Sequence, residues 1–303
     1  MKTIGVGNLG GCNLFVEREG KTMVRASIPK KPRLLPLIAL LFSFSSPTFA
    51  QQSNDDLQAA VQNPVADLIS VPFQNNTLFG IGPDDEVVDV LNIQPVVPFS
   101  LSSDVNVITR TIAPLIYIPD SVEGLDVLPE TVADDTEFGL GDINVTAFFS
   151  PAKPSGAIWG VGPSLTVPTA TDDVLGSKKW SAGPSAVMLV QPKPWTIGVL
   201  ARHLWSFAGD SDRNDVNQSL LQPFVNYNLD DGWYLVSAPV ITANWEASSG
   251  DEWTVPIGGG AGRLFKAGKL PINTQLSSFY NVEHPDAGPD WSIRLQVQFL
   301  FPK

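Results

Sequence analysis

The chain has 303 residues, one cysteine, and 31 acidic against 19 basic residues, which gives a net charge of −12 at pH 7. Residues 1–50 hold 7 of the 19 lysines and arginines but only 2 of the 31 acidic residues, so the remainder carries a net charge of −17. This charge excludes nucleic acid as an expected partner, because phosphate binding needs a positive face. No composition break follows residue 64 or so, which favours one domain over two.

The first 50 residues have the features of an export signal. Lys30, Lys31 and Arg33 precede an apolar run over 34–44, and the segment ends in Thr48-Phe49-Ala50, the small-residue pattern of a signal-peptidase site. The apolar run is too short to span a bilayer. We therefore expect a leader and signal peptide over 1–50, a periplasmic N-terminal segment over 51–64 and the folded domain over 65–303.

After residue 64 no long stretch has helical periodicity. Twelve segments are instead rich in β-branched and aromatic residues and are bounded by turn residues, which indicates β-strands. Most have ten or more residues, which suits a tilted strand that crosses a bilayer. The expected strands cover residues 65–76, 87–101, 104–118, 136–150, 156–168, 179–191, 194–208, 216–229, 232–246, 252–265, 269–283 and 290–301.

The connections between these segments alternate in length. Compact turns such as Pro192-Lys193 and Lys266-Ala267-Gly268 follow the even-numbered strands, and longer acidic loops, such as 120–135 and 209–215, follow most odd-numbered ones. Short periplasmic turns opposite longer outer loops are typical of an even-stranded outer-membrane barrel. The sequence thus predicts an all-β protein, a transmembrane antiparallel β-barrel of about 12 strands in the bacterial outer membrane. Its expected partners are outer-membrane lipid and the barrel-assembly machinery.

The last strand has the clearest alternation. Arg294, Gln296 and Gln298 point to one side with Ser292, and the opposite face is apolar. In a membrane barrel the apolar face contacts lipid and the polar face lines the lumen. A half-buried strand of a soluble sheet remains the alternative for this segment. The apolar face consists of Trp291, Ile293, Leu295, Val297, Phe299 and Phe301.

Prolines inside the expected strands argue against a closed barrel. Proline removes a donor from the hydrogen-bond ladder and usually occupies edges or bulges, whereas a closed barrel has no edge. We expect these prolines at bulges or near the membrane rim. They are Pro95, Pro163, Pro184, Pro223, Pro239 and Pro256.

Catalytic and metal-binding patterns are sparse. The chain has two histidines, His203 and His284, and no Gly-x-Ser-x-Gly motif. We expect no enzyme, no cofactor and no catalytic residue, with a Ser–His lipid hydrolase on the outer wall as a remote alternative. Cys12 lies in the leader, so the exported part has no thiol ligand.

One loop begins like a calcium site. Asp210, Asp212 and Asn214 have the right spacing, but the sixth-position glycine is missing and Leu221 stands where the twelfth-position glutamate belongs. A solvated acidic loop is the simpler interpretation, and these residues form only a weak metal candidate.

Charged residues inside the strands are the candidates for lining a pore. A charge that faces lipid at mid-depth costs about 2–4 kcal/mol, so these side chains are expected to point inward or to lie near an interface. They form either a selectivity or substrate surface, or an internal salt-bridge network that fills a narrow lumen. The candidates are Arg110, Asp142, Arg202, Arg263 and Arg294.

Several short motifs together resemble a known family. They are Gly139-Leu140-Gly141-Asp142-Ile143, Trp159-Gly160-Val161-Gly162-Pro163, Val167-Pro168-Thr169-Ala170-Thr171, Gln222-Pro223-Phe224, Asp231-Gly232-Trp233-Tyr234-Leu235, Ile241-Thr242-Ala243-Asn244-Trp245 and Gln298-Phe299-Leu300-Phe301-Pro302-Lys303. From about residue 65 to the end, the chain is similar to transporter-like proteins of the phenol-degradation meta-pathway family, some labelled neuromedin-U-like. The resemblance implies an outer-membrane barrel that passes small aromatic or hydrophobic compounds, and it supplies no catalytic residues. The terminal Pro302-Lys303 departs from the final aromatic residue usual in outer-membrane barrels.

Three functions follow as hypotheses. The first is a channel or transporter for a small-molecule permeant. The second is a barrel with a filled lumen that acts as a structural or surface protein, and the third is the barrel lipid hydrolase. A soluble periplasmic β-protein is the outside alternative.

Overall fold

The computed structural model describes residues 54–119 and 136–302. The expected leader, Cys12 and the acidic loop 120–135 lie outside these residues. The elements are α1 (Asn54–Val61), β1 (Ile69–Ile81), β2 (Glu86–Ile93), β3 (Val96–Ser100), β4 (Val105–Ile118), β5 (Glu137–Leu140), β6 (Ile143–Pro151), β7 (Ile158–Val167), η1 (Asp173–Leu175), β8 (Lys179–Val190), β9 (Trp195–Gly209), β10 (Asn217–Asn228), η2 (Asp230–Gly232), β11 (Trp233–Ser237), β12 (Ile241–Asn244), β13 (Trp253–Ala267), β14 (Leu270–Glu283) and β15 (Trp291–Phe301).

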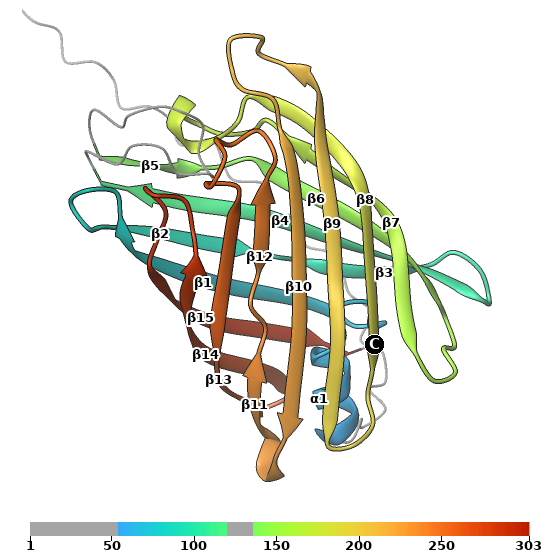
Figure 1. Ribbon diagram of the computed structural model, residues 1–303. Helices are drawn as coiled ribbons and strands as arrows, with labels where there is room; N and C mark the ends of the chain where they lie inside the picture. Colours follow the sequence, from blue (N-terminus) through green and yellow to red (C-terminus); the bar gives the residue numbers. More distant parts are fainter. Residues whose placement is uncertain (1–53, 120–135, 303) are drawn as a thin grey trace, which may run out of the picture. The chain divides into compact units, whose positions relative to one another are not determined.

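The strands form one antiparallel sheet that closes on itself (Figure 1). Each crossing pairs with the next along the chain, β1 pairs with β15, and β10 pairs with both β9 and β11–β12, so no edge remains. Three crossings consist of two strands each, β2–β3, β5–β6 and β11–β12, and the fifteen strands therefore make the twelve expected crossings. The prediction of a closed antiparallel barrel is confirmed.

The expected strand boundaries agree with the structure to within a few residues except at the first strand. Residues 65–76 were expected there, but β1 covers Ile69–Ile81. Val65 instead lies inside the barrel, in a buried cluster with lumen side chains of five strands, β4, β6, β8, β9 and β10. The apolar character of 65–68 therefore reflects burial in the lumen and not the pleat of a strand.

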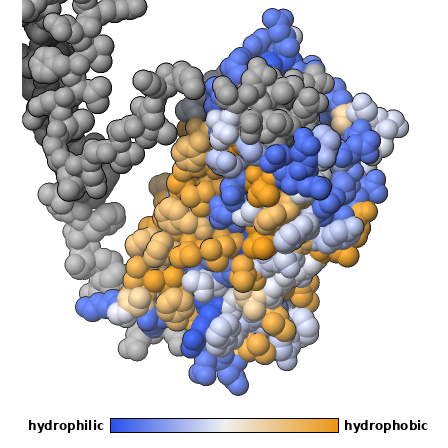
Figure 2. Space-filling model, turned by 90° about the vertical axis from the view of Figure 1, so that its left-hand side faces the viewer, coloured by the Kyte–Doolittle hydropathy of each residue, from blue (hydrophilic) through white to orange (hydrophobic). Residues whose placement is uncertain are grey.

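Alternation along the strands divides lumen from membrane. Along β15, Arg294, Gln298 and Leu300 are buried, whereas Trp291, Leu295 and Phe301 are exposed, as expected for lumen-facing and lipid-facing residues. Figure 2 shows apolar residues gathered in a band on one face, with polar residues beyond it. Exposed aromatic residues gather near both ends of the strands: Trp180, Trp205, Trp245, Trp253, Tyr280 and Trp291 beside the longer loops, and Trp159, Trp195, Trp233, Phe265 and Phe301 beside the short turns.

The N-terminal segment enters the barrel at the end of the short turns. Leu57 of α1 packs in a buried cluster with Leu264 and Leu300, and Val65 packs with Phe148 and Phe224. Figure 1 shows α1 between the strands at this end. Residues 54–64 of the segment 51–64, expected in the periplasm, thus lie inside the mouth at the short-turn end, which is the periplasmic end in outer-membrane barrels. They narrow the lumen at this end, where a cavity of about 180 Å³ remains.

The prolines are accommodated by gaps in the ladder more than by bulges or the rim. Pro95 lies between β2 and β3 and Pro239 between β11 and β12, so both fall in interrupted crossings. Pro256 lies at a register shift, as expected for a bulge. Pro163 and Pro184 face each other across β7 and β8, inside the wall, which corrects the expectation for this pair.

The region around Pro163 and Pro184 also explains a sequence repeat. Trp159–Ser164 and Trp180–Ser185 share a Gly-Pro-Ser ending, and Gly162 lies opposite Ser185 while Ser164 lies opposite Gly183. A Cβ at Gly183 would collide with the carbonyl oxygen of His203 in the next strand. Glycine is therefore needed here because neighbouring backbones approach closely.

Candidate functional site: the lumen and the outer-wall groove

A vestibule of about 650 Å³ opens among the outer loops. Asp142 lines it, but its carboxylate is fully engaged in shaping a loop. Its oxygens accept hydrogen bonds from the Ser177 backbone N–H (2.7 Å), the Ser177 hydroxyl (2.8 Å) and the backbone N–H groups of Thr169 and Ala170. Asp142 therefore lines the vestibule while it fixes the loop between β7 and β8.

The rim of the vestibule is acidic. Asp215, Glu246, Asp251 and Asp286 contribute to its lining. Asp215 pairs with Lys179 at 3.1 Å and accepts a hydrogen bond from the Ser206 hydroxyl. These hydrogen bonds, that from Lys179 first, hold the pKa of the Asp215 carboxyl below its usual value.

A central cavity of about 200 Å³ lies deeper, and Asn92, Ile112 and Arg202 line both it and the vestibule. Two of the predicted pore residues, Arg110 and Arg202, meet here. Arg110 donates to the side-chain oxygen of Gln94 at 2.6 Å, and Arg202 donates to that of Asn144 at 2.9 Å. Both guanidinium groups are thus held by neutral amides.

Arg294 faces the same lumen from β15. It donates to the Asn76 side-chain oxygen at 3.0 Å and to the Ala238 carbonyl at 2.9 Å, and it lies over the Phe279 ring. Within residues 54–119 and 136–302, no carboxylate lies within 4.0 Å of a nitrogen of Arg110, Arg202 or Arg294. The internal salt-bridge network considered as an alternative is therefore absent from the described part of the lumen.

Arg263 is not a pore-lining residue. Its neighbours Gly262 and Leu264 are buried toward the lumen, so Arg263 points outward by strand alternation. Its guanidinium lies 5.1 Å from the ring centre of the exposed Trp233 and donates to the Asp231 carbonyl. A cation beside an aromatic ring at the periplasmic interface avoids the cost of facing the membrane centre.

Polar contacts fix the N-terminal segment in the periplasmic mouth. Gln191 donates to the Ala59 carbonyl at 2.8 Å, Gln58 donates to the Trp233 carbonyl, and Gln62 donates to the Asn228 side chain. Lys193 pairs with Asp55 at 2.8 Å in solvent, which raises the pKa of Lys193. A residual cavity of about 180 Å³ remains between this segment and the lumen wall.

The hydrogen-bond ladder is interrupted between β10 and the β11–β12 crossing. Leu221 pairs with Ile241 and Val225 with Ser237, but the residues between them form no ladder pairs. At this constant register Pro223 lies opposite Pro239, and neither has an N–H to donate. Arg294 instead binds the Ala238 carbonyl that the ladder leaves free.

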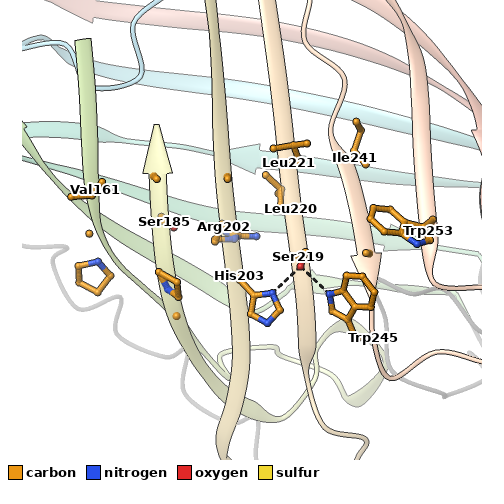
Figure 3. A pocket seen from close by; sticks show the side chains of 17 residues that line it. Val161, Ser185, Arg202, His203, Ser219, Leu220, Leu221, Ile241, Trp245 and Trp253 are labelled. Atoms are coloured by element: carbon orange, nitrogen blue, oxygen red, sulfur yellow. Dashed lines mark hydrogen bonds between the residues drawn. The ribbon is translucent and has the colours of Figure 1, made fainter. Parts of the chain in front are cut away.

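An apolar groove of about 890 Å³ lies on the outer wall beside this gap. Small or short side chains, among them Pro163, Pro184, Ser219 and Ala243, contribute to its lining. Trp245 and Trp253 lie at one end of it (Figure 3). Ser185, Arg202 and Leu220 line both this groove and the central cavity, so the two lie on opposite sides of the same wall.

Three polar groups meet in the groove. Figure 3 shows the His203 ring and the Trp245 indole both hydrogen-bonded to Ser219, with Nδ1 and Nε1 at 2.8 and 2.9 Å from Oγ. Because indole N–H only donates, the Ser219 hydroxyl is free to donate to His203 Nδ1. His203 Nε2 is buried and has no partner among the described residues. Sequence reasoning missed Ser219, because sixteen residues and a loop separate it from His203.

The weak metal candidates Asp210, Asp212 and Asn214 lie in a connecting loop. In the loop between β9 and β10, Asp210 accepts a hydrogen bond from the Asp212 backbone N–H. No group of three or more His, Cys, Asp and Glu among the described residues could hold a metal ion. Among the same residues, no helix is long and apolar enough to span a membrane.

Comparison with solved structures shows which known fold the barrel shares. No protein-family model and no curated protein matches the sequence. Among solved structures, the COG4313 outer membrane channel from Pseudomonas putida F1 has a TM-score of 0.58 at 18% identity, over 77% of this chain and 93% of that chain. The β domain of the Bordetella autotransporter Brka has 0.43 at 12%, over 78% and 100%. Outer membrane phospholipase A from Escherichia coli has 0.39 at 12%, over 82% and 97%. The chain is a β-barrel of the bacterial outer membrane.

Proposed function

We propose that the barrel is a channel for small apolar compounds, aromatic ones included, and that it releases them sideways through its wall. The shared fold with the P. putida outer membrane channel and the sequence resemblance to transporter-like proteins both support a transport role. The substrate class rests on the resemblance and on the apolar groove.

One observation carries the proposal: the backbone ladder is interrupted where an apolar groove lies on the outer wall. The ladder between β10 and β11–β12 stops on both sides of the opposed Pro223 and Pro239. Val240 lines the central cavity and its neighbour Ile241 lines the outer groove. A compound in the central cavity therefore has an apolar surface on the other side of this gap.

The cavities along the barrel axis also favour release through the wall. Vestibule and central cavity share Asn92, Ile112 and Arg202, so a compound can descend from the outer loops. Below them, α1 and residues 62–68 occupy the lumen and leave only about 180 Å³. An apolar compound thus meets a plug below and a wall gap beside it.

The proposal is tested by uptake in Gram-negative cells, whose outer leaflet slows apolar compounds. Cells that express the full chain should take up radiolabelled naphthalene faster than cells with an empty vector, and the sugar arabinose at an unchanged rate. The filled-barrel alternative predicts no gain for either compound and no discrete conductance steps in planar bilayers.

A second candidate, hydrolysis of a membrane lipid, is favoured by the 2.8 Å hydrogen bond between His203 and Ser219 in the lipid-facing groove. Against it, His203 Nε2 lacks the orienting partner that a catalytic base normally has among the described residues. Release of fatty acid from phospholipid micelles by wild type, and not by Ser219→Ala, would establish this activity. No release by wild type would eliminate it.

A further inference from the structure

The central cavity has a charged side and an apolar side. Arg110, Arg202, Gln94 and Gln222 contribute polar groups, and Phe148, Leu200, Leu220 and Val240 contribute apolar surface. From this we infer that the cavity is a binding site for a small organic carboxylate, whose anionic group contacts Arg110 and Arg202 while its apolar body faces Phe148 and Leu200. The inference rests on the proposed function only for the route by which the ligand arrives.

The first argument is uncompensated charge. A charge inside a protein is normally paired, because an isolated one loses its hydration. Among the described residues, Arg110 and Arg202 are held by amide oxygens alone, at 2.6 and 2.9 Å. The positive charge of Arg110 interacts unfavourably with those of Arg202 and Arg294. An anion placed between them removes this repulsion.

The second argument is spare hydrogen-bonding capacity. A guanidinium carries five N–H donors, whereas Arg110 and Arg202 each have one protein acceptor within residues 54–119 and 136–302. Ser185 also lines the cavity, is 4% exposed, and its hydroxyl has no partner among the described residues. Buried polar groups are normally satisfied, so the cavity offers several unused donors on one side.

The third argument concerns ligand type. A carboxylate accepts two parallel hydrogen bonds from a guanidinium, and so does a phosphate. The apolar residues that complete the cavity give inorganic phosphate nothing to bury, whereas the ring or chain of an organic acid fits against them. The surroundings therefore favour a carboxylate with an apolar body.

Arg294 has a different task. Its guanidinium is engaged by Asn76, the Ala238 carbonyl and the Phe279 ring, and it holds the interrupted β11–β12 crossing in place. It adds positive potential without lining the central cavity. For this reason the test varies Arg110 and Arg202 and leaves Arg294 intact.

The acidic vestibule lies on the approach from outside. Asp215, Glu246 and Asp251 repel an incoming anion, and salt screens this repulsion over a Debye length of about 8 Å at physiological ionic strength. The site is therefore expected to fill faster as salt rises from low levels, even though the final hydrogen bonds to arginine weaken.

The experiment is titration calorimetry of the full exported chain in detergent, with benzoate, benzyl alcohol and inorganic phosphate as probes. We expect saturable binding of benzoate and about ten-fold weaker binding of the other two, since a charge-assisted hydrogen bond contributes about 1.5–3 kcal/mol. Arg110→Gln with Arg202→Gln should weaken benzoate binding by about ten-fold or more. Arg263→Gln, which changes an outward arginine, is the matched control and should bind as wild type does.

Folding of each variant is checked by its heat-dependent mobility on SDS gels. If the double variant fails to fold, Ser185→Val tests the same cavity without a charge change and should weaken benzoate binding several-fold. Equal binding of benzoate and benzyl alcohol, or equal loss in Arg263→Gln, would overturn the inference. Benzoate binding by a barrel that transports nothing would refute the channel and leave the site intact, and naphthalene uptake without benzoate binding would do the reverse.

Discussion

Two sectors of the barrel wall differ in how continuous their backbone hydrogen-bond ladders are. Between β15 and β1, eleven residue pairs run without interruption from Ile69 to Phe79. Between β12 and β13, only two pairs form, and β10 changes partner from β12 to β11 across a gap. A closed barrel can therefore keep its topology while part of one sector lacks a ladder, provided that side chains replace the missing bonds.

The replacements are visible in the interrupted sector. Arg294 donates to the Ala238 carbonyl, the Ser237 hydroxyl donates to the Gly258 carbonyl, and buried Tyr234 donates to Asn273. Lipid offers no hydrogen bonds, so such partners are required wherever the ladder stops. The interrupted sector is thus held by a few side chains, and the continuous sector by its backbone.

The largest expected effect comes from removing the plug. Deletion of residues 54–66 should raise ion conductance in planar bilayers several-fold, because α1 and the following segment fill the periplasmic mouth. If the interrupted wall carries apolar compounds, naphthalene uptake should change far less than conductance. Lys193→Ala, which breaks only the exposed pair with Asp55, is the control. A parallel rise of uptake and conductance would mean that the straight path is the route.

A proline placed in the continuous sector should be strongly destabilising. Leu276 lies in β14 opposite Leu295 and Ala261, where ladders run on both sides. Leu276→Pro removes a donor and leaves a buried carbonyl without its partner, which costs about 1–3 kcal/mol. The barrel should then lose its heat-dependent gel mobility at a lower temperature than wild type. Leu276→Ala separates the loss of side-chain contact from the loss of the donor. An unchanged transition in Leu276→Pro would contradict the contrast between sectors.

The opposite change should seal the interrupted sector. Pro223→Val with Pro239→Val restores two N–H donors to facing positions, and we expect up to about 1 kcal/mol of added stability per new hydrogen bond. Naphthalene uptake should fall at least two-fold while conductance through the vestibule is kept. Pro163→Val with Pro184→Val, another facing pair in the same wall, serves for comparison. Undiminished uptake in the first variant would show that this gap is not the exit.

The smallest expected effect is a pH dependence at the rim. Asp215 has a lowered pKa in the folded barrel because of Lys179 and Ser206. A carboxyl of this kind stabilises the fold above its unfolded pKa, near 3.8, and that contribution disappears as the pH falls through the lower folded value. Acidification below about pH 4 should therefore loosen the β9–β10 loop. Limited proteolysis at graded pH measures this, and Asp215→Asn should be cleaved equally at every pH.

Strand number and the lumen-facing positions Arg110, Arg202 and Arg294 could be predicted because the period of two along a strand follows directly from the pleat. Arg263 was assigned wrongly for a related reason. A charge within a strand suggests the lumen, but the face depends on a register that glycines around Gly258–Gly262 obscure. Only the fold placed it over Trp233.

What the sequence determined by itself was therefore the barrel, its even strand count and the polarity of its two faces, since these depend on local alternation and on turn residues. The tertiary structure alone decided three things: that residues 54–68 fill the lumen, that Pro223 faces Pro239, and that His203 meets Ser219. Each of these depends on which strands lie side by side and in which register, and such pairings join residues too far apart in the chain for any local pattern to encode them.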